Sequence, residues 1–74
     1  MNEEIEIIQI NSFEELIKLK DVFEIQNRVG IDIRNITQTN IRRRILDFAT
    51  GIAFGRGLKI RVVNQEGVYL IYDF

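Results

Sequence analysis

The residue types that most often carry out acid–base or nucleophilic chemistry are nearly missing from this sequence. It contains no histidine and no cysteine, and Ser12 is its only serine. Catalysis by a nucleophile or a general base requires such a group beside an activating partner. Ser12 instead begins a Ser-x-x-Glu pattern, which is typical of a helix N-terminus. The sequence therefore predicts a protein that is not an enzyme.

The remaining groups that bind cofactors are also poorly arranged. Asp32 and Asp47 each lie far along the chain from a second carboxylate, and Asp47 follows Arg43 at the i,i+4 spacing that favours an ion pair on a helix. The glycines of residues 51–57 follow an expected helix, whereas a phosphate-binding loop precedes one and contains Gly-Lys-Ser/Thr. We therefore expect no metal and no other cofactor.

Charge is balanced overall but unevenly distributed. The formal net charge is −1, which provides no general attraction to nucleic acid. Acidic residues dominate residues 3–24 and basic residues dominate residues 28–61, an asymmetry that suits contacts between protein surfaces. Arg42, Arg43 and Arg44 are consecutive, and consecutive helical residues point about 100° apart, so they do not form one basic stripe. We expect protein partners and no nucleic acid.

The length of the chain limits its architecture. We expect residues 1–74 to form a single domain, because so short a chain supports only one core. With no cysteine, neither a disulfide nor a thiolate metal site stabilises it, which leaves oligomerisation as a source of stability. No apolar run approaches membrane-spanning length, and the first four residues lack the features of a signal peptide.

Hydrophobic periodicity and turn residues predict six elements. A strand is expected over residues 5–10, followed by a helix that is capped by Ser12 and ends between Phe23 and Arg28. A second strand is expected over residues 31–36, and a second helix, capped by Thr37 or Thr39, over residues 41–53. Strands over residues 58–62 and 68–72 are joined by a turn at residues 64–67.

The order β-α-β-α-β-β predicts an α/β (α+β) two-layer sandwich, with both helices on one face of a small mixed sheet. Strand alternation then divides the side chains of the last two strands. Those expected to face the helices are Leu58, Ile60, Val62, Val68 and Leu70. Val63, Tyr69 and Ile71 are expected on the uncovered face, where they would support self-association.

The second helix contains a glycine that its own sheet does not readily explain. Gly51 lies near the middle or the last turn, where glycine costs about 1 kcal/mol relative to alanine. The apolar arc of this helix is also wider than packing against one sheet requires. These features favour a contact between the helices of two subunits through Gly51. A local helix end, or packing on its own sheet, remains an alternative.

Residues 44–55 read Arg-Ile-Leu-Asp-Phe-Ala-Thr-Gly-Ile-Ala-Phe-Gly. This segment resembles the second core helix of the SepF family, which typically reads R-(I/L)-(I/V/L)-D-F-x-x-G followed by a small and an aromatic residue. The flanking segments are also similar in order and spacing: a helix that begins at Phe13, an extended segment that ends near Asn35, and the strands at residues 57–60 and 68–70. The resemblance covers nearly the whole chain.

The resemblance implies a two-layer α/β domain that dimerises and assembles further, and that holds the C-terminal tail peptide of FtsZ at the division site on the inner face of the membrane. Arg61 and Tyr69 occupy the positions of the family's basic and aromatic contact residues on the last hairpin. In the family, a separate N-terminal amphipathic helix binds the membrane. The first strand expected here begins almost at Met1, so that segment is expected to be absent from this chain.

Two other functions remain open at this stage. A small regulatory or RNA-binding α/β domain would use the basic centre of the sequence and the rings of Tyr69 and Tyr72 as a stacking platform. A purely structural oligomer would have no peptide partner. Salt dependence distinguishes the first of these, because binding to phosphates weakens steeply as salt rises.

Overall fold

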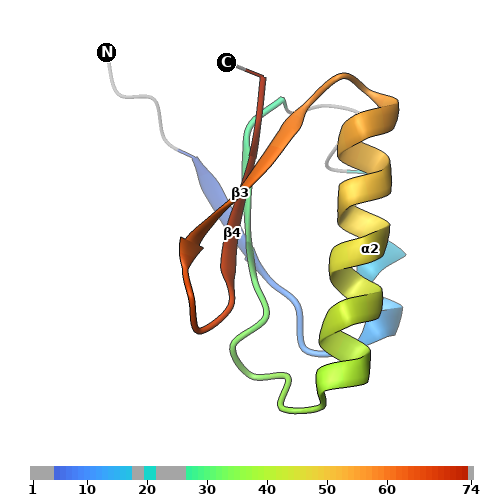
Figure 1. The fold of residues 1–74 in the computed structure, drawn as a ribbon, viewed down its shortest axis with the longest axis vertical. Helices are drawn as coiled ribbons and strands as arrows, with labels where there is room; N and C mark the ends of the chain where they lie inside the picture. Colours follow the sequence, from blue (N-terminus) through green and yellow to red (C-terminus); the bar gives the residue numbers. More distant parts are fainter. Residues whose placement is uncertain (1–4, 18–19, 22–26, 74) are drawn as a thin grey trace.

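The structure is a computed structural model that describes residues 5–17, 20–21 and 27–73. In chain order, its elements are β1 (Glu6–Gln9), the short 3-10 helix η1 (Phe13–Glu15), β2 (Val29–Asp32), α2 (Thr39–Gly55), β3 (Lys59–Asn64) and β4 (Val68–Tyr72). α2 runs along one side of the strands (Figure 1).

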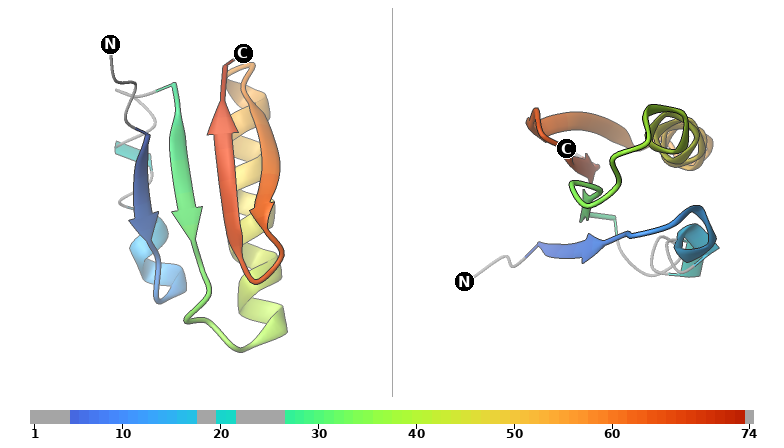
Figure 2. Two further views of the ribbon diagram at one scale, coloured as in Figure 1. Left: turned by 90° about the vertical axis from the view of Figure 1, so that its left-hand side faces the viewer. Right: turned by 90° about the horizontal axis from the view of Figure 1, so that it is seen from below.

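The four described strands form one mixed sheet in the order β1-β2-β4-β3. β1 pairs with β2 in parallel, and the β2–β4 and β4–β3 pairs are antiparallel. Figure 2 shows α2 and η1 behind the same face of this sheet, and β3 at its edge in front of α2. The α+β class, the mixed sheet and the one-sided helical layer therefore agree with the sequence prediction.

The first predicted helix is described only near its start. η1 covers Phe13–Glu15, and residues 16–17 and 20–21 are also helical. The predicted end falls partly on residues 22–26, outside the described residues. Ser12 is the N-cap of η1, but its side chain makes no capping hydrogen bond. The Glu15 carboxylate instead accepts a hydrogen bond from the Asn11 N–H at 2.9 Å, so only half of the predicted capping box forms, shifted by one residue.

α2 is longer than predicted and begins differently. Its N-cap is Gln38, without a side-chain capping bond, so the predicted threonine caps are wrong. Arg43 and Asp47 are both described and form no ion pair, because solvent-exposed helical pairs gain little from holding one geometry. After the helix, Gly57 adopts a φ of 71°, which a residue with a side chain rarely does.

The core lies between the helical layer and the covered face of the sheet. Every residue of β2 is buried, and α2 contributes a row of buried residues at i, i+4 and i+8. The buried cluster consists of Ile10, Leu16, Val29, Ile31, Ile33, Ile36, Ile45, Ala49, Ala53, Leu58 and Ile71. The isoleucine-rich sequence thus supplies bulk from the strands and small alanines from the helix, so that the two layers approach closely.

A bulge in the β3–β4 hairpin reverses the predicted faces of β4. Val62 lies opposite Tyr69, but Asn64 lies opposite Val68, so the register shifts by one residue between them. An extra residue in one strand inverts every side chain of its partner relative to the expectation. Ile71 pairs with Ile60 and is fully buried on the helix side. Its predicted place on the uncovered face was therefore wrong.

Candidate functional site

The uncovered face of the sheet, here called the open face, contains a shallow apolar groove of about 210 Å³. Ile7 of β1 is 61% exposed and Val63 of β3 is 59% exposed. Between them, Val68 and Leu70 of β4 form the floor, and Gly30 of β2 lies beside Ile7. A methyl group on Gly30 would approach Ile7 Cγ1 to 2.9 Å, so glycine here allows the Ile7 side chain to lie across β2.

Arg61 and Tyr69 do not share a face, contrary to the sequence prediction. Arg61 lies opposite Leu70 on the open face, and its guanidinium lies 5.6 Å from the centre of the Tyr72 ring. Tyr69 lies opposite Val62 and packs against the core from the helix side. The bulge is the physical reason, because it changes the phase of β4 relative to β3. Tyr69 and Tyr72 are three residues apart in β4, so alternation puts them on opposite faces and they do not form the predicted stacking platform.

A second groove, here called the edge groove, lies between α2 and the edge strand β3. It has a volume of about 180 Å³ and is almost entirely apolar. Leu46 and Thr50 of α2 form one wall. The rest of its lining comes from the two hairpin strands: Ile60, Arg61, Val62 and Tyr69. Sequence reasoning missed this groove, although Leu46 extends the apolar arc of α2 beyond the core, which was the available signal.

Gly51 lies on the exposed back of α2. A methyl group added to Gly51 or to Gly55 would meet no atom within 4 Å. Phe48 and Phe54 are exposed on the same helix, Phe54 to 69%. Packing against the protein's own sheet, one of the alternatives for Gly51, is therefore not what the structure shows. Nothing within the described protomer requires glycine at this position.

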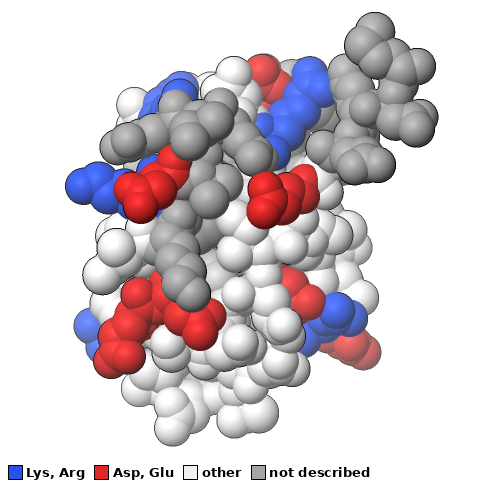
Figure 3. Space-filling model, turned by 180° about the vertical axis from the view of Figure 1, so that it is seen from behind, with Lys and Arg blue, Asp and Glu red and all other residues white. Residues whose placement is uncertain are grey.

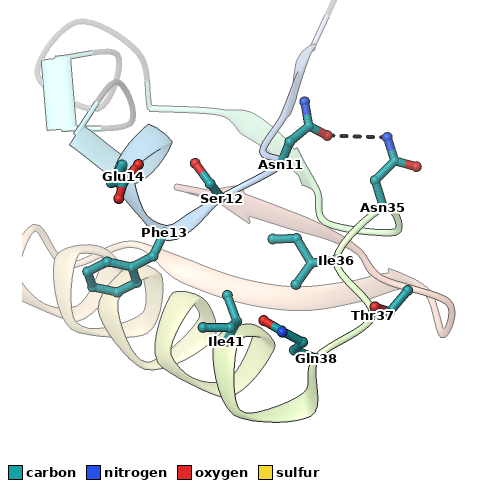
Figure 4. A pocket seen from close by; sticks show the side chains of 9 residues that line it. All are labelled: Asn11, Ser12, Phe13, Glu14, Asn35, Ile36, Thr37, Gln38 and Ile41. Carbon is teal, nitrogen blue, oxygen red and sulfur yellow. Dashed lines mark hydrogen bonds between the residues drawn. The ribbon is translucent and has the colours of Figure 1, made fainter.

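A polar pocket lies at the opposite end of α2 from these glycines, between the start of η1 and the loop before α2 (Figure 4). The Asn35 side-chain amide donates a hydrogen bond to the Asn11 side-chain oxygen at 3.2 Å. Phe13 lies along α2 and receives the Arg44 guanidinium 4.5 Å from its ring centre. These contacts connect the segment after β1 to α2 and give the pocket a structural explanation.

Among the residues that the structure describes, one carboxylate is buried, and it is fully partnered. Asp32, at the end of β2, accepts hydrogen bonds from the Arg34 N–H at 3.0 Å, from Arg34 Nε at 3.0 Å and from Arg34 Nη2 at 2.8 Å. These bonds hold the pKa of Asp32 below its ordinary value of 3.8. Asp32 therefore stabilises the turn at residues 33–35 as a permanent anion, and it is poorly suited to proton transfer.

Acidic and basic groups are not evenly mixed on the surface of the molecule. Figure 3 shows the molecule from behind, with acidic side chains spread over a largely uncharged surface and the basic groups near its margins. Glu6 of β1 and Glu14 and Glu15 of η1 belong to this half of the sheet, whereas Lys59 and Arg61 belong to β3 at the other edge.

The described part of the chain contains no group of three acidic, histidine or cysteine side chains placed to hold a metal ion. Of the helices in the same part, none has the length and apolar character needed to cross a membrane. The surface features that could recognise a ligand in these residues are therefore the open face, the edge groove and the back of α2.

Comparison with known proteins identifies a family for this chain. No curated protein was found to match the chain. A family model described as cell division protein SepF matches residues 5–72, which include all four described strands and α2. The matched range contains both grooves and the glycines of α2. The chain therefore belongs to the SepF family of cell-division proteins, and the family associates it with the division site.

Proposed function

We propose that this protein is a non-enzymatic cell-division adaptor that self-associates and binds the C-terminal tail of FtsZ. It would act in the cytoplasm, on the inner face of the membrane, and a segment outside the described domain would connect it to that membrane. The family match over residues 5–72 carries this proposal. The apolar edge groove beside the last hairpin, bordered by Arg61, supports a peptide as the ligand.

The chemistry of the edge groove fits a tail that offers acidic and aliphatic side chains. Arg61 forms no ion pair with any of the described residues, so its charge is available to a carboxylate. The groove walls beside it are mainly aliphatic and would bury aliphatic side chains of the peptide. Such a pairing of a cation with apolar area is common where a few residues dominate binding.

Two surfaces support self-association. The open face exposes Ile7 and Val63, and an apolar patch on so small a protein is stabilised when a second copy covers it. The back of α2 offers Gly51 and Gly55, four residues apart, where a neighbouring helix would approach closely. We propose the open face for the dimer and Gly51 for further assembly. Ile71, which the sequence had also assigned to self-association, is buried within the protomer.

Calorimetry with an FtsZ tail peptide tests the adaptor function directly. The unmodified protein should bind the tail and should not bind a peptide of the same composition in scrambled order. Arg61→Glu should lose on the order of 1–3 kcal/mol of binding free energy, which is typical of a central contact. Arg44→Glu, which makes the same charge change on the far side of α2, is the matched control. Absence of tail binding by a correctly folded dimer would refute the FtsZ assignment.

A further inference from the structure

The outer edge of β3 is one of the two edges of the sheet that the structure describes, and β1 forms the other. β3 pairs only with β4, so the backbone groups on its other edge meet no strand within the described residues. Unpaired edges of this kind accept an additional strand, from the same protein or from another chain. Every residue of β3 except Ile60 is exposed. The edge is therefore open to a segment of extended peptide.

The two sides of this edge differ in chemistry. On the helix side, Ile60 and Val62 point toward the edge groove, which α2 walls off with Leu46 and Thr50. On the open-face side stands Arg61, with Lys59 two residues before it. Neither cation forms an ion pair with a described residue. Alternate residues of β3 are thus aliphatic toward α2 and cationic toward the open face.

We propose that the β3 edge binds an extended peptide by strand addition, and that it selects a segment in which aliphatic and acidic residues alternate. An added strand lies about 4.8 Å from β3, and its side chains alternate between the faces with a period of two. Its aliphatic residues then enter the edge groove beside Ile60 and Val62. Its acidic residues lie beside Lys59 and Arg61, at the distance of a cross-strand pair.

Charge favours such a peptide over a second copy of this chain at the same edge. Pairing two β3 strands edge to edge in the same sheet would bring Lys59 and Arg61 of both copies onto one face. Like charges on neighbouring strands are destabilising. An acidic segment reverses the sign of this interaction, and the apolar lining of the edge groove excludes water from the other side of the strand.

This inference deepens the proposed FtsZ-tail function, because it specifies how the tail would bind, and it rests on that function for its natural ligand. Its test uses N-methylated peptides. In a strand, successive N–H groups point to opposite edges, so methylation of alternate residues blocks only one edge. We would titrate two methylated versions of the FtsZ tail peptide into the protein, alongside the unmodified tail. One version, or phase, is N-methylated at the odd-numbered residues of the peptide and the other at the even-numbered residues.

The expected result is asymmetric. One phase should weaken binding by roughly tenfold or more, because it removes the backbone hydrogen bonds to β3, and the other phase should bind nearly as well as the unmodified tail. Equal loss in both phases would indicate a helical or turn conformation, and no loss in either would indicate binding by side chains alone. Either of these results overturns strand addition while leaving the FtsZ function standing.

A peptide that alternates glutamate and valine separates this proposal from the FtsZ assignment. It should bind with the same sensitivity to a single methylation phase, and a peptide of equal composition with its glutamates and valines in two blocks should bind at least several-fold more weakly. If the alternating peptide binds in this way and the tail does not, strand addition stands and the FtsZ assignment fails. If the peptide with its glutamates and valines in two blocks binds equally well, the proposed selectivity for an alternating sequence is wrong.

Two substitutions locate the binding site. Thr50→Trp fills the edge groove from an α2 position outside the core. It should reduce the affinity for the FtsZ tail and for the alternating glutamate–valine peptide by about tenfold. Arg61→Glu should reverse the preference, so that a peptide alternating lysine and valine binds better than its glutamate counterpart. Arg44→Glu should change neither the peptide affinities nor the preference for glutamate over lysine. If affinity falls as the protein is concentrated, a second copy occupies the edge and the proposal is overturned.

Discussion

The two faces of the sheet are built for different purposes. The covered face consists of isoleucine, valine and leucine packed against the alanines of α2, and its central residues are fully buried. The open face consists of fewer apolar side chains, of which Ile7 and Val63 remain exposed, together with the cation of Arg61. A small domain therefore obtains its stability from one face, which leaves the other face and its edge free for recognition. Substitutions on the two faces should have separable effects.

The largest expected effect comes from a residue whose face the sequence misassigned. Ile71→Ala removes a fully buried side chain and should lower the free energy of unfolding by about 2–4 kcal/mol. Val63→Ala, an apolar truncation on the neighbouring strand, should change it by less than about 0.5 kcal/mol in the isolated protomer. Urea denaturation at a protein concentration that keeps the chain monomeric compares them. Equal losses would show that both faces are packed.

The next effect concerns the turn of the hairpin. Gly67 has a φ of 137°, and a methyl group there would lie 3.3 Å from the Arg34 nitrogen and from Ile33 Cγ1, and would clash with the Arg42 side chain. Gly67→Ala should therefore cost about 1–3 kcal/mol of folding free energy. Thermal denaturation measures this cost. Gly57→Ala, at a φ of 71° in open space, is the control for backbone strain without crowding, and it should cost less.

The sequence was sufficient for the mixed sheet and for α2 because their signals were local, whereas the predicted first helix and the exact order of six elements are not confirmed. Val68–Tyr72 was predicted with its observed bounds, and the helix around residues 41–53 was found with extensions at both ends. The faces of β4 were not predictable in the same way. The bulge at Val62–Asn64 depends on how a turn closes, and a shift of one residue inverts every side chain that follows. For this reason Arg61 and Tyr69 do not share a face, although both residues line both grooves.

The candidate site was predictable only in part. Arg61 and Val63 lie on the open face, as alternation along β3 indicated, and the wide apolar arc of α2 was visible in the sequence. The edge groove could not be predicted from the sequence, because it depends on α2 lying across the sheet and leaving the outer side of β3 uncovered. The position of α2 depends on how the helical layer packs against the sheet, and no sequence motif predicts it.

A smaller and pH-dependent effect is expected for Asp32. Its pKa is lowered by the hydrogen bonds from Arg34, so this interaction stabilises the fold above pH 3.8 and is lost as the pH falls through the lower pKa of the folded state. Asp32→Asn should cost about 1 kcal/mol at neutral pH. The difference from the unmodified protein should narrow in acid. Urea titrations at neutral and acidic pH test this, and a difference that does not depend on pH would contradict it.

The smallest effect should have the opposite sign. Gly51→Ala should stabilise the isolated protomer by up to about 1 kcal/mol, because alanine favours the helix and its methyl group meets nothing. Gly51→Lys should leave the protomer folded but weaken assembly beyond the dimer, which sedimentation velocity would detect. If Gly51→Lys assembles as the unmodified protein does, the back of α2 is not an assembly surface.

The hairpin tip is attached to the rest of the protein at several points. The Arg42 guanidinium donates to the Glu66 carbonyl, the Ile33 N–H donates to the Gly67 carbonyl at 2.8 Å, and Asn64 Oδ1 accepts from the Glu66 N–H at 2.7 Å. Loop tips usually open locally and exchange their amide hydrogens quickly. Here the Glu66 and Gly67 amides should exchange slowly, together with those of β2, because releasing the tip requires separating it from both the loop after β2 and the first turn of α2. These contacts would then hold β3 rigid at the end that leads into the hairpin turn.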